Sequence, residues 1–433
     1  APLFPVLLVH FIGTLGFSIV LPFLVFVVVR LGGNALVYGV VGAAYPALQM
    51  IGAPILGRWS DRYGRRRVLL LSQAGTLASW VLFAVALALP VVEIASVDAP
   101  LLGHFRLTLP LLVILAARAL DGLTGGNISV ANAYVADISP DEHRSSNFGR
   151  MGIASNLGFI VGPALAGLLG GTALGELLPV LAALVVSLVA TLLIAFYLPE
   201  SKPCEPEESA TRTTVGRVFG REHRDCFQEQ SVDRTTIAEI CAQHNMARTL
   251  TLYFVVFLAF NIFYTAFPMR AAADLAWHVT DTGLYFAVLS TMMVVAQGPL
   301  LATLSRRFSD PTLIVAGGVI LSGNFALLLS SDTTVIYLAA VLFAVGNGIM
   351  WPSVLSLLSK LADDRYQGAV QGVAGSAGSL ASIAGLLAGG LLFEQLGAAT
   401  FLFSTALILV ACGVALPLLR TTERRRARSD SLS

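Results

Sequence analysis

The sequence has few charged residues. Only 12% of its 433 residues are Asp, Glu, Lys or Arg, whereas about 25% of the residues in ordinary soluble domains are charged. Hydrophobic residues make up 56% of the chain, and its mean hydropathy is +0.79. A chain of this composition cannot cover itself with a water-facing surface, which excludes an ordinary soluble protein.

Cysteine and lysine are also scarce. The four cysteines have neither a CxxC spacing nor the density of a small secreted domain, so we expect no disulfide framework and no metal site. Lysine occurs only at Lys202 and Lys360, so arginine carries nearly all of the positive charge. The 27 basic and 26 acidic residues give a net charge of +1, which does not point to nucleic acid as a partner.

Motifs of ATP-driven pumps and of enzymes are missing as well. We find no phosphate-binding loop, no nucleophile with its base, and no cluster of metal ligands in the sequence. We therefore expect no enzyme activity, no catalytic residue and no cofactor. Any transport by this chain has to be coupled to a gradient.

Long apolar runs fill most of the chain. A membrane-spanning helix needs about 20 mostly apolar residues, and six such runs precede Pro199 while six more follow Arg248. Their boundaries are about 3–29, 35–57, 68–92, 108–136, 148–171 and 177–198, then 249–272, 282–304, 312–330, 333–358, 368–393 and 399–419. This pattern predicts an all-α integral membrane protein with twelve transmembrane helices.

The polar segments divide these runs into two sets. We predict an N-terminal six-helix bundle at 1–198, a cytoplasmic linker at 199–247, a C-terminal six-helix bundle at 248–419 and a basic cytoplasmic tail at 420–433. The halves are weakly alike, as in transporters built from parallel repeats. A shift of 223 residues aligns five pairs of glycines: Gly125 with Gly348, Gly149 with Gly372, Gly152 with Gly375, Gly162 with Gly385, and Gly167 with Gly390. The two bundles are therefore expected to be pseudo-symmetric.

Basic residues gather on one side of the predicted membrane. If the N-terminus is inside, 23 of the 27 Lys and Arg residues lie in inside segments, and the others are Arg30, Arg106, Arg118 and Arg270. The positive-inside rule then places both termini and the linker in the cytoplasm. We expect a multi-pass, monomeric protein of the bacterial inner membrane.

The segment GRWSDRYGRRR joins the second and third spans in a tight turn. Gly64 supplies the turn, and Asp61 at a helix end can pair with an arginine or with a helix N-terminus. The segment resembles the signature loop of the major facilitator superfamily, which latches the cytoplasmic side while the other side is open. This resemblance implies a role in the cytoplasmic gate for Gly57, Asp61, Arg62, Gly64 and Arg65.

Three further segments resemble the drug/proton antiporter branch of that superfamily, and its tetracycline-resistance exporters in particular. They are RALDGLTGGN from Arg118, AYVADISPDEHR from Ala133 and GFIVGPALAGLLGG from Gly158. The resemblance runs from about residue 12 to 200 and recurs more faintly from 282 to 395.

The third of these segments predicts a thin, bendable helix that its neighbours can approach closely. Its helix-bending residues are Gly158, Gly162, Pro163 and Gly167. In antiporters of the branch it resembles, this pattern is associated with export. Packing of small residues without any role in export is the alternative.

Asp121 is the only carboxylate inside an apolar run. An ionisable residue at that depth is costly, so we expect it to face a cavity or a partner. In one interpretation Asp121 and Arg118, three residues apart on one helix, only neutralise each other. In the other, Asp121 exchanges a proton when a cationic substrate competes, and Arg118 biases the local field. His10, the only histidine in an apolar run, either relays protons or is a hydrogen-bonded packing residue.

Polar and aromatic residues at helical spacing predict the lining of a substrate cavity. One such stripe runs from Arg118 through Gly122, Gly125 and Ser129 to Asn132. The predicted cavity residues are Phe17, Asn132, Asn261, Tyr264, Asn347 and Trp351. An aromatic and amide lining suits a large, partly apolar organic substrate, and ordinary helix packing is the alternative.

The sequence departs from the tetracycline exporters that it resembles. They carry embedded acids in spans 1, 3 and 9, whereas this chain has Gly13, Ser79 and Asn324 at or near those places. The departure argues against tetracycline as the substrate. It leaves proton coupling to Asp121 or His10.

Taken as a whole, the sequence predicts a secondary active transporter that works by alternating access. It would export amphiphilic organic compounds, multidrug-like or tetracycline-like, in exchange for protons. One alternative is uptake or facilitated transport of a metabolite or lipid by the same fold without proton antiport. Another is a non-transporting membrane receptor or scaffold. The expected partners are a small organic substrate, protons and the lipid bilayer.

Overall fold

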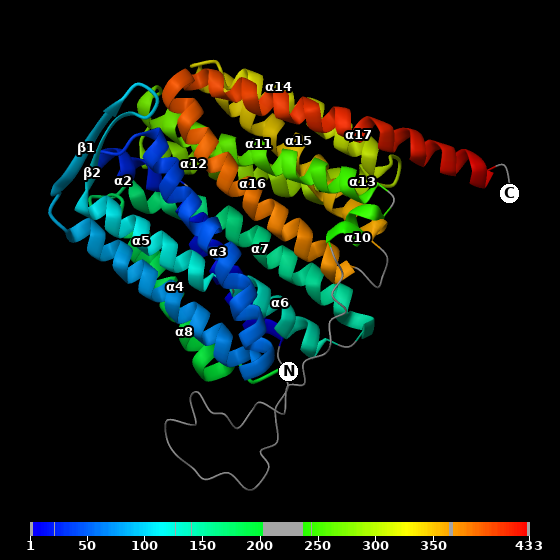
Figure 1. The fold of residues 1–433 in the computed structure, drawn as a ribbon, viewed down its shortest axis with the longest axis horizontal. Helices are drawn as coiled ribbons and strands as arrows, with labels where there is room; N and C mark the ends of the chain where they lie inside the picture. Colours follow the sequence, from blue (N-terminus) through cyan, green and yellow to red (C-terminus); the bar gives the residue numbers. More distant parts are fainter. Residues whose placement is uncertain are drawn as a thin grey trace, which may run out of the picture. The chain divides into compact units, whose positions relative to one another are not determined.

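The computed structural model describes residues 3–20, 22–125, 127–139, 141–201, 237–243, 245–362 and 367–430. Most of these residues are helical (Figure 1). Before the linker the elements are α1 (Leu3–Ser18), α2 (Leu24–Arg30), α3 (Ala35–Tyr63), α4 (Arg65–Ala88), β1 (Glu93–Ala99), β2 (Gly103–Thr108), α5 (Leu109–Thr124), α6 (Asn127–Ile138), α7 (Asp141–Gly170) and α8 (Leu177–Tyr197).

The later elements are again helical. They are α10 (Ile237–Ala242), α11 (Met246–Ala273), α12 (Val279–Val295), the π-helix η2 (Ala296–Leu300), α13 (Leu301–Leu304), α14 (Asp310–Leu327), α15 (Thr333–Leu361), α16 (Gln367–Leu396), the 3-10 helix η4 (Gly397–Ala399) and α17 (Thr400–Asp430).

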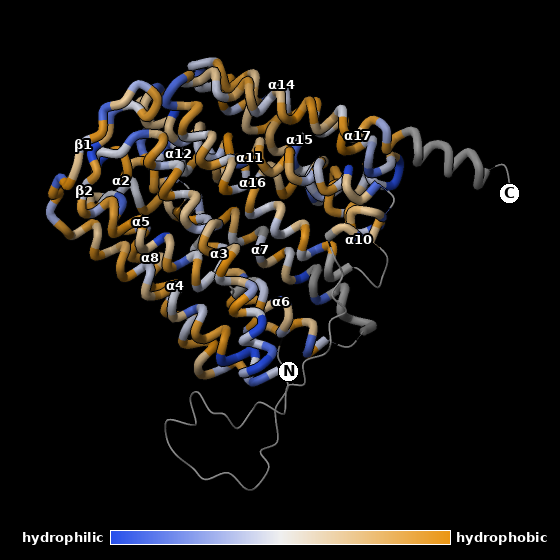
Figure 2. Tube along the Cα trace, in the orientation of Figure 1, coloured by the Kyte–Doolittle hydropathy of each residue, from blue (hydrophilic) through white to orange (hydrophobic). Residues whose placement is uncertain are grey.

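Ten helical stretches of the described chain are long and apolar enough to cross a membrane. One of them, Val370–Leu419, contains both α16 and α17, and the apolar helix α1 is shorter than the other spans. Counting α1, and counting α16 and α17 separately, gives the twelve predicted apolar helices. Hydrophobic residues run along them, and hydrophilic residues lie mainly in the joining segments (Figure 2).

Many apolar side chains on these helices face outward, as expected of helices in lipid. On α8, for example, Val185 is 56% exposed and Leu192 is 45% exposed. A water-soluble protein rarely exposes so much contiguous apolar surface.

Three of the predicted spans are interrupted. The first ends as α1 and resumes as α2 beyond Pro22, whose ring nitrogen cannot donate a backbone hydrogen bond. The fourth breaks at Gly125, between α5 and α6. The eighth passes through η2, which contains Pro299. Proline and π-helical turns are the usual causes of such breaks.

A two-stranded hairpin adds to the predicted helices. β1 and β2 form it in the connection between α4 and α5. Gln395 Nε2 on α16 donates to the carbonyls of Pro100 and Leu101 at its tip, at 3.1 and 2.9 Å. The backbone N–H of Arg106 donates to Gly32 O. These bonds satisfy backbone groups that the tight turn leaves unpaired.

The chain folds into two compact units. The first contains Ala1–Val20, Ala44–Val92 and Thr108–Asp233, and the second contains Leu21–Ala43, Glu93–Leu107 and Arg234–Ser433. The predicted linker at 199–247 lies mostly outside the described residues, as do Cys204 and Cys226. Helix α10 lies near the C-terminal end of the predicted linker, and α17 continues into the predicted tail.

Each unit has its own core. In the first unit α4 packs against α5 and α8, and a cluster of buried apolar residues includes Leu69, Tyr134 and Ile194. The core of the second unit is aromatic, with Phe263 and Phe343 stacked at 4.9 Å between ring centroids. Arg270, 2% exposed, donates from Nη2 to the carbonyls of Leu329 and Ser330 and so caps the end of α14.

Candidate functional site

The site is built around two charged residues of α5. Arg118 is 6% exposed and Asp121 is 8% exposed, and Arg118 Nη1 lies 3.4 Å from Asp121 Oδ2. The Arg118 guanidinium also lies over the Tyr45 ring, 4.9 Å from its centroid. Arg118 Nε has no hydrogen-bond partner. The pair is therefore buried with only part of its hydrogen-bonding capacity used.

Neighbouring helices support Asp121. Thr76 and Ser79 on α4 hydrogen-bond to its carboxylate. On the α3 side, a Cβ added at Gly122 would collide with the backbone of Tyr45, so this glycine permits the close approach of α3 and α5. The approach places the Tyr45 ring beneath Arg118.

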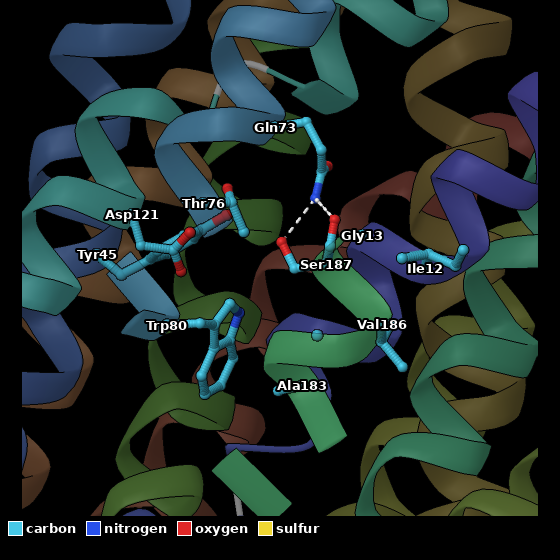
Figure 3. A pocket seen from close by; sticks show the side chains of 11 residues that line it. Ile12, Gly13, Tyr45, Gln73, Thr76, Trp80, Asp121, Ala183, Val186 and Ser187 are labelled. Carbon is cyan, nitrogen blue, oxygen red and sulfur yellow. Dashed lines mark hydrogen bonds between the residues drawn. The ribbon is translucent and has the colours of Figure 1, made fainter. Parts of the chain in front are cut away.

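Asp121 borders a small cavity inside the first unit (Figure 3). The space open to the centres of water molecules is about 30 Å³. About 10–15 Å³ of such space admits one water, so roughly two waters fit. The lining residues come from α1, α3, α4, α5 and α8: Ile12, Gly13, Gly16, Tyr45, Gln73, Thr76, Trp80, Asp121, Ala183, Val186 and Ser187.

Gln73 is the most deeply buried polar residue of this cavity. Its side chain is 1% exposed, and Nε2 donates to Ser187 Oγ at 3.0 Å (Figure 3). Gln73 Oε1 has no hydrogen-bond partner. An unsatisfied buried acceptor costs free energy unless water or a ligand supplies a donor.

The structure places His10 away from this cavity. His10 lies on α1, 8% exposed, and its Nε2 is 2.6 Å from Ser155 Oγ on α7. It does not belong to the lining that contains Asp121. This geometry is that of a hydrogen-bonded packing residue, and a role in proton relay stays a prediction.

The predicted stripe from Arg118 to Asn132 extends over two helices, α5 and α6. Helix α5 ends at Thr124 and α6 starts at Asn127, and Gly126 between them lies outside the described residues. Half-buried Asn132 is not part of the Asp121 lining. The Phe17 side chain lies outside the described residues. A single stripe from Arg118 to Asn132 stays a prediction.

The other predicted cavity residues lie in the second unit. Trp351 packs with Tyr253, Phe257 and Phe260 at centroid distances of 5.1, 5.2 and 6.1 Å. Tyr264 packs against Phe263 and Phe286. Asn261 donates to Phe257 O at 2.8 Å, and Asn347 Nδ2 lies 3.2 Å from Met293 Sδ. Asn261 and Trp351 both contact Phe257, Asn261 through the backbone carbonyl and Trp351 through the ring. Substrate binding by these residues stays a prediction.

Five polar or aromatic lining residues were not predicted from the sequence: Tyr45, Gln73, Thr76, Trp80 and Ser187. Gln73 could have been predicted from the sequence, because an amide inside the apolar run at 68–92 needs a buried partner. Tyr45 and Trp80 could not have been predicted as lining residues, since buried aromatics are common in any helix bundle.

Two of the predicted gate residues, Asp61 and Arg65, form an ion pair. Gly64 has φ +94°, which starts α4 directly after α3. Arg65 Nη1 lies 2.5 Å from Asp61 Oδ1 and donates to Ser60 Oγ at 2.6 Å, and Arg65 Nε lies 3.0 Å from Asp137 Oδ2 on α6. Ser60 Oγ donates to Gly57 O at 2.7 Å. Arg62 is exposed. The loop is thus tied to α6 through Arg65.

The helix-bending residues of α7 pack closely on α1. A Cβ at Gly158 would lie 2.9 Å from Phe11 O and from Leu15 N, and one at Gly162 would collide with Ser18 Oγ. Ser18 Oγ donates to Gly158 O at 2.8 Å. Pro163 and Gly167 are buried. The motif therefore provides a close helix contact in this structure.

Within the described residues, no group of three or more His, Cys, Asp and Glu side chains could hold a metal ion. The chemistry available at Asp121 is consequently that of a carboxylate, an amide, hydroxyls and a guanidinium. These groups can bind protons and cations or donate and accept hydrogen bonds.

Comparisons with known proteins agree with this architecture. The chain is 30% identical over 367 residues to the class D tetracycline resistance protein of Salmonella ordonez, covering 83% of this chain and 80% of the relative. It is 25% identical over 407 residues to multidrug resistance protein 2 of Bacillus subtilis, covering 93% and 92%. A solved D-xylose–proton symporter has the same fold, with a TM-score of 0.70, 17% identity and coverage of 96% and 97%.

Most of the chain therefore has counterparts among known transporters. The family model described as "Major Facilitator Superfamily" matches residues 6–385 and 249–432. The resemblance to tetracycline and multidrug resistance proteins, predicted from short motifs, is confirmed over most of the chain. The chain belongs to the major facilitator superfamily, and it is a membrane transporter and not an enzyme.

Proposed function

We propose that this transporter exports amphiphilic organic compounds in exchange for protons, and that Asp121 binds the exchanged proton. The observation that carries the proposal is a carboxylate, 8% exposed inside a membrane helix, that borders a small cavity with both polar and apolar lining residues. Ionisable groups at such depth are retained where they serve transport. The similarity to tetracycline and multidrug resistance proteins favours export over uptake.

The surroundings of Asp121 support this assignment. Gly13 and Ser79 stand at or near two places where the tetracycline exporters carry acids. Gly13 borders the Asp121 cavity, and Ser79 hydrogen-bonds to the carboxylate. Asp121, on the fourth span, thus lies close to the two positions where those relatives carry acids on the first and third spans. We infer a proton-coupling role for Asp121 with Arg118, and a substrate that differs from tetracycline.

The remaining features extend the proposal. Residues 1–198 and 248–419 form two six-helix bundles that rock around a midplane site, joined by the linker at 199–247. The loop from Gly57 to Arg65 latches the cytoplasmic side. Both termini and the tail at 420–433 lie in the cytoplasm of a bacterium, in accordance with the positive-inside rule, and the protein acts as a monomer in the inner membrane.

A second candidate function is uptake or facilitated transport without proton exchange. The contact of 3.4 Å between Arg118 and Asp121 favours it, because a paired carboxylate can serve neutralisation alone. A non-transporting receptor has no comparable support from the described residues.

Substrate-driven proton movement in proteoliposomes tests the proposal. Purified protein would be reconstituted with a pH-sensitive dye inside, and lipophilic amines would be added. The wild type is expected to move protons with substrate, and Asp121→Asn is expected to stop proton movement. The matched control is Asp98→Asn, since Asp98 is exposed on β1. Solute flux without proton movement in the wild type, or full coupling in Asp121→Asn, would refute the proposal.

A further inference from the structure

Two of the side chains that line the cavity beside Asp121 carry buried acceptor oxygens. One is the Asp121 carboxylate, and the other is Gln73 Oε1, which has no hydrogen-bond partner on a side chain that is 1% exposed. Figure 3 shows Gln73 and Asp121 entering the cavity from two sides, with Trp80 along its edge. Protein groups already hydrogen-bond to the Asp121 carboxylate, whereas Gln73 Oε1 needs a donor that the described residues do not supply.

The cavity is small for an organic molecule. About 30 Å³ open to water centres admits roughly two waters. An ammonium group, –NH3+, is about the size of a water molecule, and its three N–H bonds are donors with no acceptor. A trimethylammonium group is larger by three methyl groups and has no N–H. The space and the acceptors therefore match the first group and reject the second.

The apolar part of the lining matches the carbon next to such a nitrogen. Ile12, Ala183 and Val186 border the cavity, and Gly13 and Gly16 leave it open on the α1 side. Trp80 also borders the cavity.

Arg118 does not occupy this space. Asp121 also borders a second, smaller cavity, which is lined by Arg118, Ser79, Trp80, Phe83 and Ala117. Arg118 is absent from the lining of the first cavity. An incoming cation can thus approach the carboxylate from the Gln73 side while Arg118 stays on the other.

We propose that this cavity binds the protonated primary amine of the substrate, with Asp121 and Gln73 Oε1 accepting its N–H bonds. The substrates are then amphiphilic primary amines, and quaternary ammonium compounds are excluded from the cavity. The inference rests on the proposed function in that it takes the cargo to be an amphiphilic organic compound.

Equilibrium binding to the purified full-length protein tests the inference without any gradient. The probes are 1-naphthylmethylamine and its N,N,N-trimethyl analogue, measured by isothermal titration calorimetry at neutral pH. We expect the amine to bind about tenfold more tightly, since a site built around hydrogen-bond acceptors discriminates against a ligand that lacks donors. Equal affinity for the two probes would overturn the inference.

Two variants locate the effect in the cavity. Gln73→Leu is expected to weaken binding of the amine without changing binding of the trimethyl analogue. The preference for the amine should then fall to about threefold or less. Gly16→Ala leaves its new Cβ 3.9 Å from Trp80 Nε1, an ordinary contact, so the variant folds while its methyl group narrows the cavity. Gly16→Ala is also expected to weaken binding of the amine. Gln395→Leu, exposed on α16 in the second unit, is the matched control and keeps the wild-type preference.

The outcomes separate this inference from the proposed function. A preference that survives in both Gln73→Leu and Gly16→Ala would show that the amine binds elsewhere, and the inference would fail while Asp121-dependent proton movement could stand. The opposite result is that both variants lose the preference for the amine while Asp121→Asn leaves proton movement unaffected. That result would uphold the amine site and reject proton coupling through Asp121.

Discussion

Arg118 Nη1 lies 3.4 Å from Asp121 Oδ2, and both side chains are about nine-tenths buried in α5. Each charge relieves the cost of burying the other, but the pair remains poorly satisfied because Arg118 Nε has no partner. A buried pair of this kind is weak evidence for stability, since desolvation of both ions offsets their attraction. Under the proposed function, the pair serves proton coupling and not stability.

Substitutions in this pair distinguish stability from function. Arg118→Met and Asp121→Leu each leave one unpaired buried charge, and each is expected to cost about 3–5 kcal/mol of stability. The double variant removes both charges and should recover most of that loss, which thermal unfolding in detergent can measure. It should nevertheless fail to move protons with substrate. A double variant that still couples protons would assign the pair a structural role only.

Close packing of α7 on α1 makes a second prediction. Gly162→Ala would place a methyl group on Ser18 Oγ, and Gly158→Ala would press on the α1 backbone, so both are expected to lower thermal stability by about 1–3 kcal/mol. Gly152→Ala is the control on the same helix, because its Cβ would meet nothing within 4 Å. Gly152→Ala should be neutral or slightly stabilising. Equal effects at all three positions would show that helix propensity, and not the contact with α1, explains the glycines.

The sequence was sufficient to predict the twelve helices, because length and hydropathy alone decide which segments can enter lipid. Asp121 could also be predicted as a site residue, since an acid inside an apolar run is conspicuous without a structure. The break at Gly125 could not, because glycine is tolerated in membrane helices and only tertiary contacts decide where one interrupts the helix.

The rest of the cavity depends on which helices meet. Tyr45, Trp80 and Ser187 come from α3, α4 and α8, and no local pattern in any of these helices indicates that they share a space. The hairpin of β1 and β2 was missed for a similar reason, since its strands are short and its tip is fixed by Gln395 from a distant helix. Such features follow from packing and not from periodicity.

The gate loop makes a third prediction. Arg65 and Asp137 have side chains 16% and 12% exposed, whereas Asp61 is 60% exposed. Since exposed ion pairs contribute little, Asp61→Asn should change stability by about 1 kcal/mol or less. Asp137→Asn removes a shielded, charge-assisted hydrogen bond and should cost about 1.5–3 kcal/mol. Chemical denaturation of the two variants measures the difference. If Asp61→Asn leaves stability intact but slows transport, its role is in the gate.

The start of α15 makes a prediction about pH. Asp332 precedes Thr333, and its carboxylate accepts the N–H groups of Thr334 and Val335 at 2.7 and 3.1 Å, which lowers the pKa of Asp332 below its ordinary value. A group with a lowered pKa in the folded state stabilises the protein above its ordinary pKa of about 3.9, and this stabilisation is lost as the pH falls through the lowered value. Wild type should therefore exceed Asp332→Ala in melting temperature at neutral pH, and the gap should narrow below about pH 4.

Asp332→Asn separates the charge from the cap. Asparagine still accepts hydrogen bonds at a helix N-cap but does not titrate. At neutral pH this variant should therefore be less stable than the wild type and more stable than Asp332→Ala. Its advantage over Asp332→Ala should persist in acid. The comparison uses the melting temperatures of the three proteins across a pH series. A gap between wild type and Asp332→Ala that stays constant into acid would mean that the cap acts through hydrogen bonding alone. In that case the negative charge beside the first turn of α15 contributes nothing to folding.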